Sequence, residues 1–167
     1  EEIKKLIDAL EVLKINKFHW HLTDDQGWRF ESERFPVLNT VAAVRPYSDF
    51  GKVYEEGPYG TVYTKAQMRE IVAYCAERGI EVIPEFDIPG HTSALLSAIL
   101  SLSCTGENVS IKTHQGIFKD VLCLAKDEVY NTVIAIIDEI LEVFPGKYIH
   151  IGGDEAPRDM WKECPDC

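Results

Sequence analysis

The sequence predicts an α/β protein with a parallel sheet, in one domain of 167 residues. Three short apolar segments are each preceded by a segment with helical spacing, which gives the order helix, strand, helix, strand, helix, strand. The apolar segments have the continuous character of strands that are covered by helices. Because each connection is long enough to hold a helix, consecutive strands can pair in parallel through right-handed crossovers.

The first helix is predicted over residues 2–14, where apolar side chains recur at the spacing of one helix face. A strand is expected over residues 15–22. Residues 23–63 are rich in Gly, Pro, Asp and aromatic residues without a sustained period. This composition indicates a long loop at one end of the sheet.

The second helix is predicted over residues 64–78. It begins with a capping box, because Thr64 and Gln67 can each satisfy a free backbone N–H at the helix start. Gly79 is placed to end the helix in the left-handed conformation. A strand of the fully buried kind follows over residues 80–86.

A turn over residues 87–91 leads to a short helix over residues 92–100 and then to a polar excursion. The longest helix is predicted over residues 126–144, where a Pro-Gly pair ends it. Residues 148–151 are expected to form the third strand.

The composition excludes two classes of partner. The 17 Lys and Arg and the 28 Asp and Glu residues give a net charge of −11, which repels nucleic acids and anionic lipid surfaces. The longest apolar runs, such as residues 133–137, are far shorter than the roughly 18 residues that cross a bilayer. We expect a soluble chain, and a removed export signal would leave the same sequence.

Five cysteines, an odd number, do not form the pattern of a disulfide scaffold at this size. Cys104 and Cys123 flank a loop and can pair if the protein is exported. Residues Cys164 and Cys167 form a CxxC motif, but one such motif without a second pair gives weak support for a structural zinc. Cys75 lies in an apolar helical pattern and is expected in the core.

Polar side chains follow the ends of all three predicted strands. In parallel sheets and barrels, catalytic residues lie beyond the carboxyl ends of the strands. Three strand ends that bring acids and imidazoles to one face therefore predict an active site. The residues concerned are His21, Asp24, Asp25, Asp87, His91, His150, Asp154 and Glu155.

The pair Asp154-Glu155 follows two glycines, which let the backbone pass close to a ligand while two adjacent acids are presented. The alternative is a helix start at Ala156-Pro157 with favourable acidic residues before it. The local sequence supports both interpretations equally. The polar strand ends nearby favour a functional pair.

A second enzyme interpretation starts from His19 and His21, which lie two residues apart and so share a face of the first strand. Some barrel hydrolases hold a divalent metal with this pattern, as metal-dependent amidohydrolases do. Such a site would recruit His91 or His150 and an acid, and would activate a water molecule. Each histidine alone is more often a hydrogen-bonded interior residue, and His114 receives no role.

Two of the three tryptophans receive different predictions. Trp20 alternates with the histidines of the first strand and is expected in the core beneath the helices. Trp28 lies in the following loop, where an aromatic face can stack on the apolar face of a sugar ring. Trp28 is therefore the candidate binding residue.

Three blocks of the sequence carry a specific resemblance. They are residues 19–26 (HWHLTDDQ), 84–92 (PEFDIPGHT) and 150–155 (HIGGDE), in this order and spacing. Together they resemble the family 20 glycoside hydrolases, the β-N-acetylhexosaminidases, and bacterial members in particular. The resemblance runs over essentially the whole chain.

The resemblance implies a (β/α)₈ TIM barrel that removes terminal β-linked N-acetylglucosamine or N-acetylgalactosamine from glycans with retention and without a metal or other cofactor. In this family the substrate's own acetamido group replaces a carboxylate nucleophile and forms an oxazolinium intermediate. Glu155 is then the general acid, which needs burial or a nearby carboxylate to hold its proton. Asp154 stays ionised, orients the acetamido group and stabilises the intermediate.

The geometry of a turn agrees with this division of roles. Adjacent residues at a turn point in different directions, whereas the carboxyl groups of an ordinary retaining pair stand opposed, about 5 to 5.5 Å apart. By resemblance, Asp24 lies near the sugar in the terminal subsite, and further residues hydrogen-bond around the acid or line the pocket. These further residues are His91, His150, Asp87 and His21.

The family's first strand and the later strands with their sugar-binding residues are absent from residues 1–167. A complete barrel takes about 250 residues. The chain is therefore predicted to be one segment of the catalytic domain, covering about the second to fourth strands with their helices. Its open edges favour association with the remainder of the barrel or with itself.

Activity of the isolated segment is doubtful on this interpretation, because groups that complete the site lie outside it. The non-enzyme alternative is a sugar-binding fragment that keeps Asp24, Asp154 and Trp28 but lacks turnover. By resemblance to the family, the protein is expected to be exported to the periplasm, the cell surface or the medium.

Overall fold

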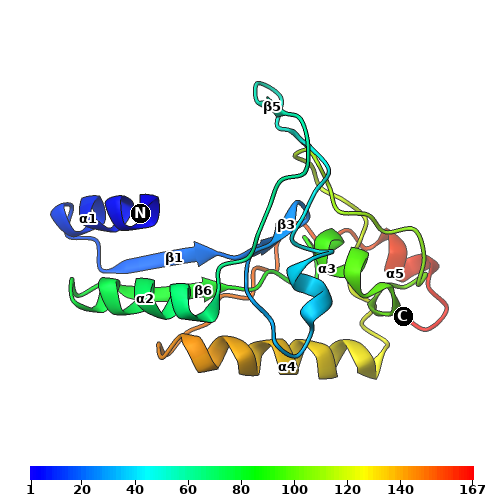
Figure 1. Cartoon of the computed structure of the whole chain (residues 1–167). Coiled ribbons are helices and arrows are strands. Elements are labelled where there is room, and N and C mark those ends of the chain that lie inside the picture. The colour runs from blue at the N-terminus through cyan, green and yellow to red at the C-terminus, as the bar shows by residue number, and fades with distance from the viewer.

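The computed structural model describes residues 1–167 and places two parallel strands at the centre of the chain (Figure 1). Strand β1 (Lys17–His21) pairs in parallel with β6 (Glu81–Glu85), and the last residues of the two strands lie opposite each other. This pairing confirms the predicted parallel sheet. In Figure 1, β1 points toward helices α3 (Ser93–Ala98) and α5 (Asp159–Glu163), which mark the carboxyl end of the sheet.

The third predicted strand is present only as a single bridge. His150 bridges Glu85 in parallel, and its backbone N–H and C=O form hydrogen bonds of 2.9 and 3.0 Å with the β6 side. The prediction of a regular strand over residues 148–151 is therefore wrong in length. Tyr148 and Ile151 are 62% and 53% exposed, because no further strand covers the outer edge of this segment.

The three long helices lie inside their predicted ranges: α1 (Glu2–Val12), α2 (Lys65–Ala76) and α4 (Asp127–Val143). The capping box of α2 is formed. The Thr64 hydroxyl accepts the N–H of Gln67 at 3.1 Å, and the Gln67 side chain accepts the N–H of Thr64 at 2.9 Å. None of the helices combines the length and the apolar character that crossing a membrane requires.

The helix expected over residues 92–100 is divided, because Ile99 leaves the helical conformation at φ −131° and ψ 76°.

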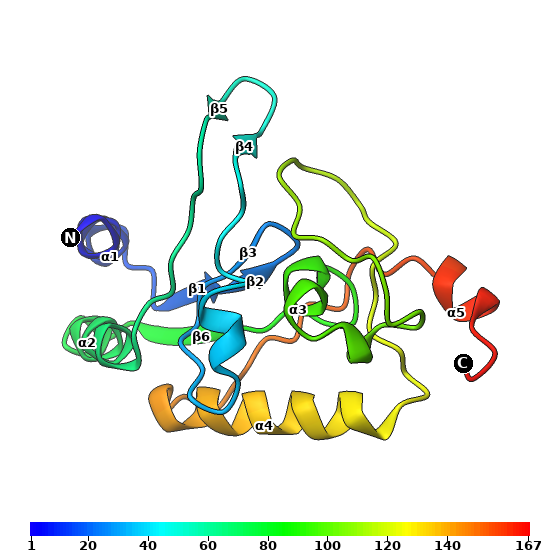
Figure 2. The ribbon, with the colours of Figure 1, turned by 45° about the vertical axis from the view of Figure 1, so that its right-hand side comes forward.

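The predicted loop over residues 23–63 contains only short elements. Figures 1 and 2 show that one short hairpin, β4–β5, protrudes from the molecule. The short elements are β2 (Thr23–Asp24), β3 (Gly27–Trp28), β4 (Ser48–Asp49), β5 (Tyr54–Glu55) and 3₁₀ turns at Pro36–Asn39 and Leu100–Leu102.

The three long helices follow one another around one side of the sheet (Figure 2). Trp20 lies on this side, 7% exposed, with its ring edge-to-face against Tyr63 and Phe144. The neighbouring His19 and His21 side chains lie on the other face and are 48% and 45% exposed. Both the core position of Trp20 and the shared face of the two histidines are thus confirmed.

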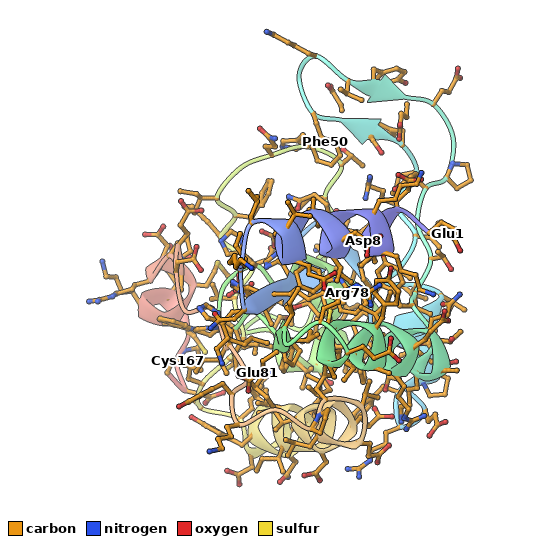
Figure 3. The ribbon with its side chains drawn as sticks, turned by 90° about the vertical axis from the view of Figure 1, so that its left-hand side faces the viewer. Glu1, Asp8, Phe50, Arg78, Glu81 and Cys167 are labelled. Atoms are coloured by element: carbon orange, nitrogen blue, oxygen red, sulfur yellow. The ribbon has the colours of Figure 1, made fainter.

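An ion pair ties α1 to α2. Figure 3 shows Asp8 and Arg78 between these helices, where the Arg78 Nε atom lies 3.1 Å from Asp8 Oδ1. The Tyr74 hydroxyl donates to the same oxygen at 2.6 Å. Because exposed pairs contribute at most about 1 kcal/mol, the fully buried Ile7 is the stronger anchor of α1.

Lys65, at the start of α2, is a buried cation between distant segments. Its Nζ atom lies 3.1 Å from Glu33 and from Glu139, and 2.9 Å from Glu142. Burial lowers the pKa of Lys65, but hydrogen bonds to these carboxylates outweigh that effect and raise it. Glu139 is itself buried and accepts the Ser32 hydroxyl at 2.5 Å, so this network joins α2, α4 and the loop after β3.

Candidate active site

Glu85, at the carboxyl end of β6, is a buried carboxylate that contacts three histidines. Its Oε2 atom lies 2.8 Å from His19 Nε2 and 2.6 Å from His21 Nδ1, and Oε1 lies 3.1 Å from His150 Nδ1. Burial opposes ionisation, but the hydrogen bond from His21 and the charges of the histidines outweigh it and lower the pKa of Glu85. Strand pairing therefore brings the three predicted strand ends to one carboxylate.

His21 links this carboxylate to the segment that follows β1. Its Nε2 atom lies 3.2 Å from Asp24 Oδ2, while Nδ1 faces Glu85. The hydrogen bond to Asp24 raises the pKa of His21 to about 9 against the effect of burial, and Glu85 adds to the rise. Burial raises the pKa of Asp24, but hydrogen bonds from His21 and from the N–H of Asp25 outweigh it and lower the pKa.

His91 connects this segment to the last loop of the site. Its Nδ1 atom lies 3.1 Å from Asp25 Oδ2 and 3.2 Å from Asp24 Oδ1. Its Nε2 atom lies 3.4 Å from Glu155 Oε2 and 3.9 Å from Asp154 Oδ2. Burial lowers the pKa of His91, but the charges of Asp24 and Asp25 outweigh it and raise the pKa. One imidazole therefore faces both members of the acid pair.

Asp25 fixes the orientation of His91 from beneath. Its carboxylate is buried, and Oδ1 accepts the N–H and the hydroxyl of Ser93 at 2.9 and 2.5 Å.

Sequence reasoning gave Asp25 no individual role and missed Glu85. The signal for Glu85 was available, since it is an acid inside a strand predicted to be fully buried, and buried acids require partners.

Asp87 lies under the loop that follows His150 and is 3% exposed. Its Oδ1 atom accepts the N–H of Gly153 at 3.3 Å. Burial raises the pKa of Asp87 to about 6, although the N–H of Gly153 and the charge of His91 act in the opposite direction. Gly152 approaches so closely that a Cβ atom there would lie 1.7 Å from Asp87 Oδ1.

The acid pair lies in a loop with left-handed backbone. Gly152, Gly153 and Glu155 have φ values of +63°, +97° and +44°. The Asp154 and Glu155 side chains are 68% and 48% exposed, so residues 1–167 do not give Glu155 the burial that we expect of a proton-holding acid. Helix α5 begins only at Asp159, so the alternative of a helix start at 156–157 is wrong.

The prediction that Trp28 stacks on a sugar is wrong. Trp28 is 1% exposed, its indole N–H donates to the carbonyl of Phe30, and its ring packs edge-to-face on Phe86 at 5.8 Å. The physical reason is that the β2–β3 hairpin turns this ring into the core. The structure brings the other predicted site residues together at the carboxyl end of the sheet: His21, Asp24, Asp87, His91, His150, Asp154 and Glu155.

Nitrogen and oxygen donors that suit a divalent metal also lie at the strand ends. The donor atoms of His19, Glu85 and His150 lie within 4.8 Å of one another, and those of His21, Glu85 and Asp87 form a second such group. No single group contains both His19 and His21, so the structure does not bring the two histidines of β1 together as ligands of one ion. The geometry of the site is compatible with acid–base chemistry.

A profile described as glycosyl hydrolase family 20, catalytic domain, matches residues 1–167. The chain belongs to glycosyl hydrolase family 20. This family membership implies a TIM-barrel fold and confirms the resemblance carried by the three sequence blocks.

Two family 20 relatives show how much of a longer protein the chain represents. A β-hexosaminidase of Porphyromonas gingivalis is 44% identical over 100% of this chain and 21% of its own length. A β-hexosaminidase of Akkermansia muciniphila is 40% identical over 99% of this chain and 33% of its own length. The chain therefore spans about a fifth to a third of these relatives.

Solved structures of family 20 members agree with the fold. A crystal structure of a β-N-acetylhexosaminidase has a TM-score of 0.92 and 41% identity, over 99% of this chain and 34% of the other. A mutant Streptomyces plicatus β-hexosaminidase in complex with the product GlcNAc has a TM-score of 0.82 and 41% identity, over 93% of this chain and 30% of the other.

Proposed function

We propose that the protein containing this chain removes terminal, non-reducing β-linked N-acetylglucosamine or N-acetylgalactosamine from glycans with retention of configuration. The family match and the names of the relatives, which are β-hexosaminidases, support this reaction class. The GlcNAc complex of the Streptomyces relative supports the sugar. The observation that carries the proposal is the position of His91, whose Nε2 atom faces both Asp154 and Glu155.

Glu155 is proposed as the general acid that protonates the leaving oxygen. After this proton has left, Glu155 is a carboxylate 3.4 Å from His91 Nε2. The raised pKa of His91 favours its positive form, and this charge stabilises the carboxylate as it develops. General acids of this kind contribute typically about 10²- to 10⁴-fold to the rate.

Asp154 is proposed to accept the N–H of the substrate's acetamido group. This hydrogen bond makes the acetamido carbonyl oxygen a better nucleophile and stabilises the positive oxazolinium ring. The oxygen forms a bond to the anomeric carbon while the glycosidic bond breaks. Water then opens the ring from the opposite face, so that two inversions give net retention. The 68% exposure of Asp154 leaves its carboxylate accessible to a ligand.

The remaining residues are proposed to position these two acids and the sugar. Asp24 is partly exposed and is proposed to contact the sugar in the terminal subsite, with His21 beside it. Asp87 holds the glycines of the acid loop, and His150 holds its start against Glu85. These contacts form a continuous polar layer beneath the proposed subsite.

Residues 1–167 are proposed to be the second to fourth strands of the barrel, as a single segment of the catalytic domain. The exposed edge at Tyr148 and Ile151 and the small share of the relatives that is covered support this assignment. An edge of this kind favours association with the remaining strands or with a second copy.

The first experiment measures fluorophore release from an aryl β-N-acetylglucosaminide by the full-length protein and its Glu155→Gln variant. We expect kcat to fall about 10²- to 10⁴-fold in the variant with little change in KM. The exposed Glu163→Gln, in the following helix, is the matched control and is expected to keep full activity. Full activity of Glu155→Gln would overturn the assignment.

A second experiment separates the metal-dependent alternative. His19→Asn removes an imidazole that a metal hydrolase of the predicted kind would need as a ligand. Our proposal gives His19 no contact with substrate, so we expect turnover within about tenfold of wild type. Loss of turnover in His19→Asn together with full activity in Glu155→Gln would support the amidohydrolase interpretation instead.

A third experiment tests the participation of the substrate. An N-trifluoroacetyl analogue has a less nucleophilic carbonyl oxygen and the same leaving group, so it should react more slowly than the acetamido substrate. Asp154→Asn should slow both substrates, and NMR of the first product should show the β-anomer. Equal rates for the two substrates would contradict the oxazolinium route.

A further inference from the structure

Four of the five cysteines converge at one place, away from the candidate active site. The Sγ atoms of Cys104, Cys123, Cys164 and Cys167 all lie within 4.8 Å of one another. The closest pairs are Cys123 with Cys167 at 3.5 Å, and Cys104 with Cys167 and Cys123 with Cys164 at 3.9 Å. None of the four is in a disulfide bond, so the pairing of Cys104 with Cys123 that export would allow is not formed in this structure.

We propose that these four cysteines bind one structural zinc ion. Tetrahedral zinc has Zn–S distances of about 2.3 Å, which places its sulfur ligands about 3.8 Å from one another. The three sulfur–sulfur distances of 3.5 to 3.9 Å match this arrangement, and the other three are no longer than 4.8 Å. Four thiolates with no open position are the ligand set of a structural zinc site rather than a catalytic one.

Local backbone geometry prepares the sulfur atoms for this role. Backbone N–H groups of Cys167 and Asp166 donate toward the Cys164 sulfur. A backbone N–H of Ala125 donates in the same way toward Cys123. Such N–H groups orient thiolate ligands and stabilise their negative charge around a metal.

The closeness of the thiols also explains why a cation is needed. The sulfur atoms lie close together, and Cys123 and Cys164 are buried. Several thiolates in one place repel each other, so the cluster cannot ionise fully by itself. A divalent cation removes this repulsion and releases the protons.

The proposed zinc ion joins two segments that lie far apart in the sequence. Cys104 and Cys123 flank the polar excursion, and the other two cysteines follow α5. Figure 2 shows α5 and the C-terminus beside this excursion, on the opposite side of the molecule from α1 and α2. The Trp161 N–H already donates to the carbonyl of Leu122 at 2.8 Å across the same boundary.

This cross-link anchors the far end of the acid-bearing loop. Only residues 156–158 separate Glu155 from α5, and His150 holds the other end of the loop at β6. A zinc ion behind α5 therefore restricts the segment that carries the proposed acids. The proposal concerns structure alone and does not depend on the reaction assigned to the site.

The test measures zinc in the full-length protein, produced with added zinc under reducing conditions and then passed through gel filtration. We expect about one zinc ion per chain, and less than about 0.1 in Cys104→Ser and in Cys167→Ser. Cys75→Ala is the matched control, because Cys75 is buried in α2 and outside the cluster, and it should keep its zinc. Background zinc in the wild type would overturn the proposal.

Two measurements on the wild type keep the test valid if a variant fails to fold. Cobalt substitution should give the intense visible bands of tetrahedral thiolate-bound Co²⁺. Thiol titration of the denatured, unreduced protein after metal removal should find all five thiols free. A weak octahedral cobalt spectrum would overturn zinc binding. A count of three free thiols or one would also overturn it, because the missing thiols would then be in disulfide bonds.

Discussion

Glu85 and the acid pair Asp154-Glu155 lie in one chain of polar contacts, but they are held in different ways. Glu85 is 7% exposed in its side chain and contacts three imidazoles at the ends of paired segments. Asp154 and Glu155 are 68% and 48% exposed, and they contact protein mainly through His91. Sheet register places the first group, whereas loop conformation places the second.

The difference shows what fixes the position of Glu85 and what fixes the position of the acid pair. The position of Glu85 follows from backbone hydrogen bonds on both sides of β6. The acid pair depends on a left-handed backbone that non-glycine residues adopt only at a cost of about 1 to 2 kcal/mol. Strain of this kind persists where the surroundings impose it, and such sites are often functional. Substitutions in each of the two regions test this contrast.

The largest effect is expected from Gly152→Ala. The new Cβ atom would lie 1.7 Å from Asp87 Oδ1, on a residue with φ of +63°. Overpacking and backbone strain together should lower the free energy of unfolding by about 3 kcal/mol or more. The change is measured as a shift in the urea or thermal unfolding midpoint of the protein.

Gly153→Ala is the matched control for this prediction. Gly153 has φ of +97°, but no atom lies within 4 Å of the position that a Cβ atom would take there. The free energy of unfolding of Gly153→Ala should therefore fall only by the cost of the left-handed backbone, about 1 to 2 kcal/mol. Equal losses in the two variants would show that the contact with Asp87 does not hold the loop.

The second effect is the pH dependence of stability that comes from Asp87. Its pKa is raised by burial from 3.8 to about 6 in the folded protein. The stability contributed by protonated Asp87 is therefore complete below about pH 3.8 and is lost as the pH rises through about 6. The loss should amount to roughly 2 to 3 kcal/mol by linkage.

Asp87→Asn tests this linkage, because the amide keeps an acceptor for the N–H of Gly153 and has no proton to lose. Unfolding of the variant should depend less on pH than unfolding of the wild type between about pH 4 and 7. Parallel curves for the two proteins would contradict the raised pKa.

The third prediction compares the two regions directly. Glu85→Gln preserves shape but cannot accept hydrogen bonds from three imidazoles, so it should cost about 1 to 3 kcal/mol of stability. Glu155→Gln alters a half-exposed side chain and should change stability by no more than about 0.5 kcal/mol. Thermal unfolding of both variants measures the contrast. A larger stability loss for Glu155→Gln would reverse our description of the two regions.

The smallest effect concerns His21, whose pKa is raised to about 9, first by Asp24 and then by Glu85. A raised histidine pKa gives stability that is complete below about pH 6.5 and is lost as the pH rises through about 9. Since the side chain is 45% exposed, solvent screening limits this to roughly 1 kcal/mol. NMR titration of Asp24→Asn should show a lower His21 pKa, and an unchanged value would contradict the assigned partner.

The sequence predicted the elements that its own periodicity determines. The three long helices, the two paired strands and the capping box at Thr64 all depend on residues near one another in the chain. The third strand could not be predicted in the same way. Its regularity depends on a neighbour at its outer edge, and Tyr148 remains exposed there.

The candidate site was predicted in composition but not in arrangement. Eight polar residues were placed at the correct end of the sheet because parallel strands share that end. The burial of Trp28 could not be predicted, since it depends on how a short hairpin folds against Phe86. The cysteine cluster was missed for a similar reason, because its members lie 41, 44 and 63 residues apart in the closest cross-segment pairs.

Lys65 affects the geometry of the candidate active site, although it lies far from the site residues in the sequence. A slip of α4 by one turn would displace its side chains by about 5.4 Å and would separate the ammonium from Glu139 and Glu142. Helix α4 leads directly to the segment that pairs with β6. The buried Lys65 ammonium on the helix side of the sheet therefore fixes the position of α4 along the crossover. This position sets the register of the next segment, so that His150 and no neighbouring residue pairs with Glu85.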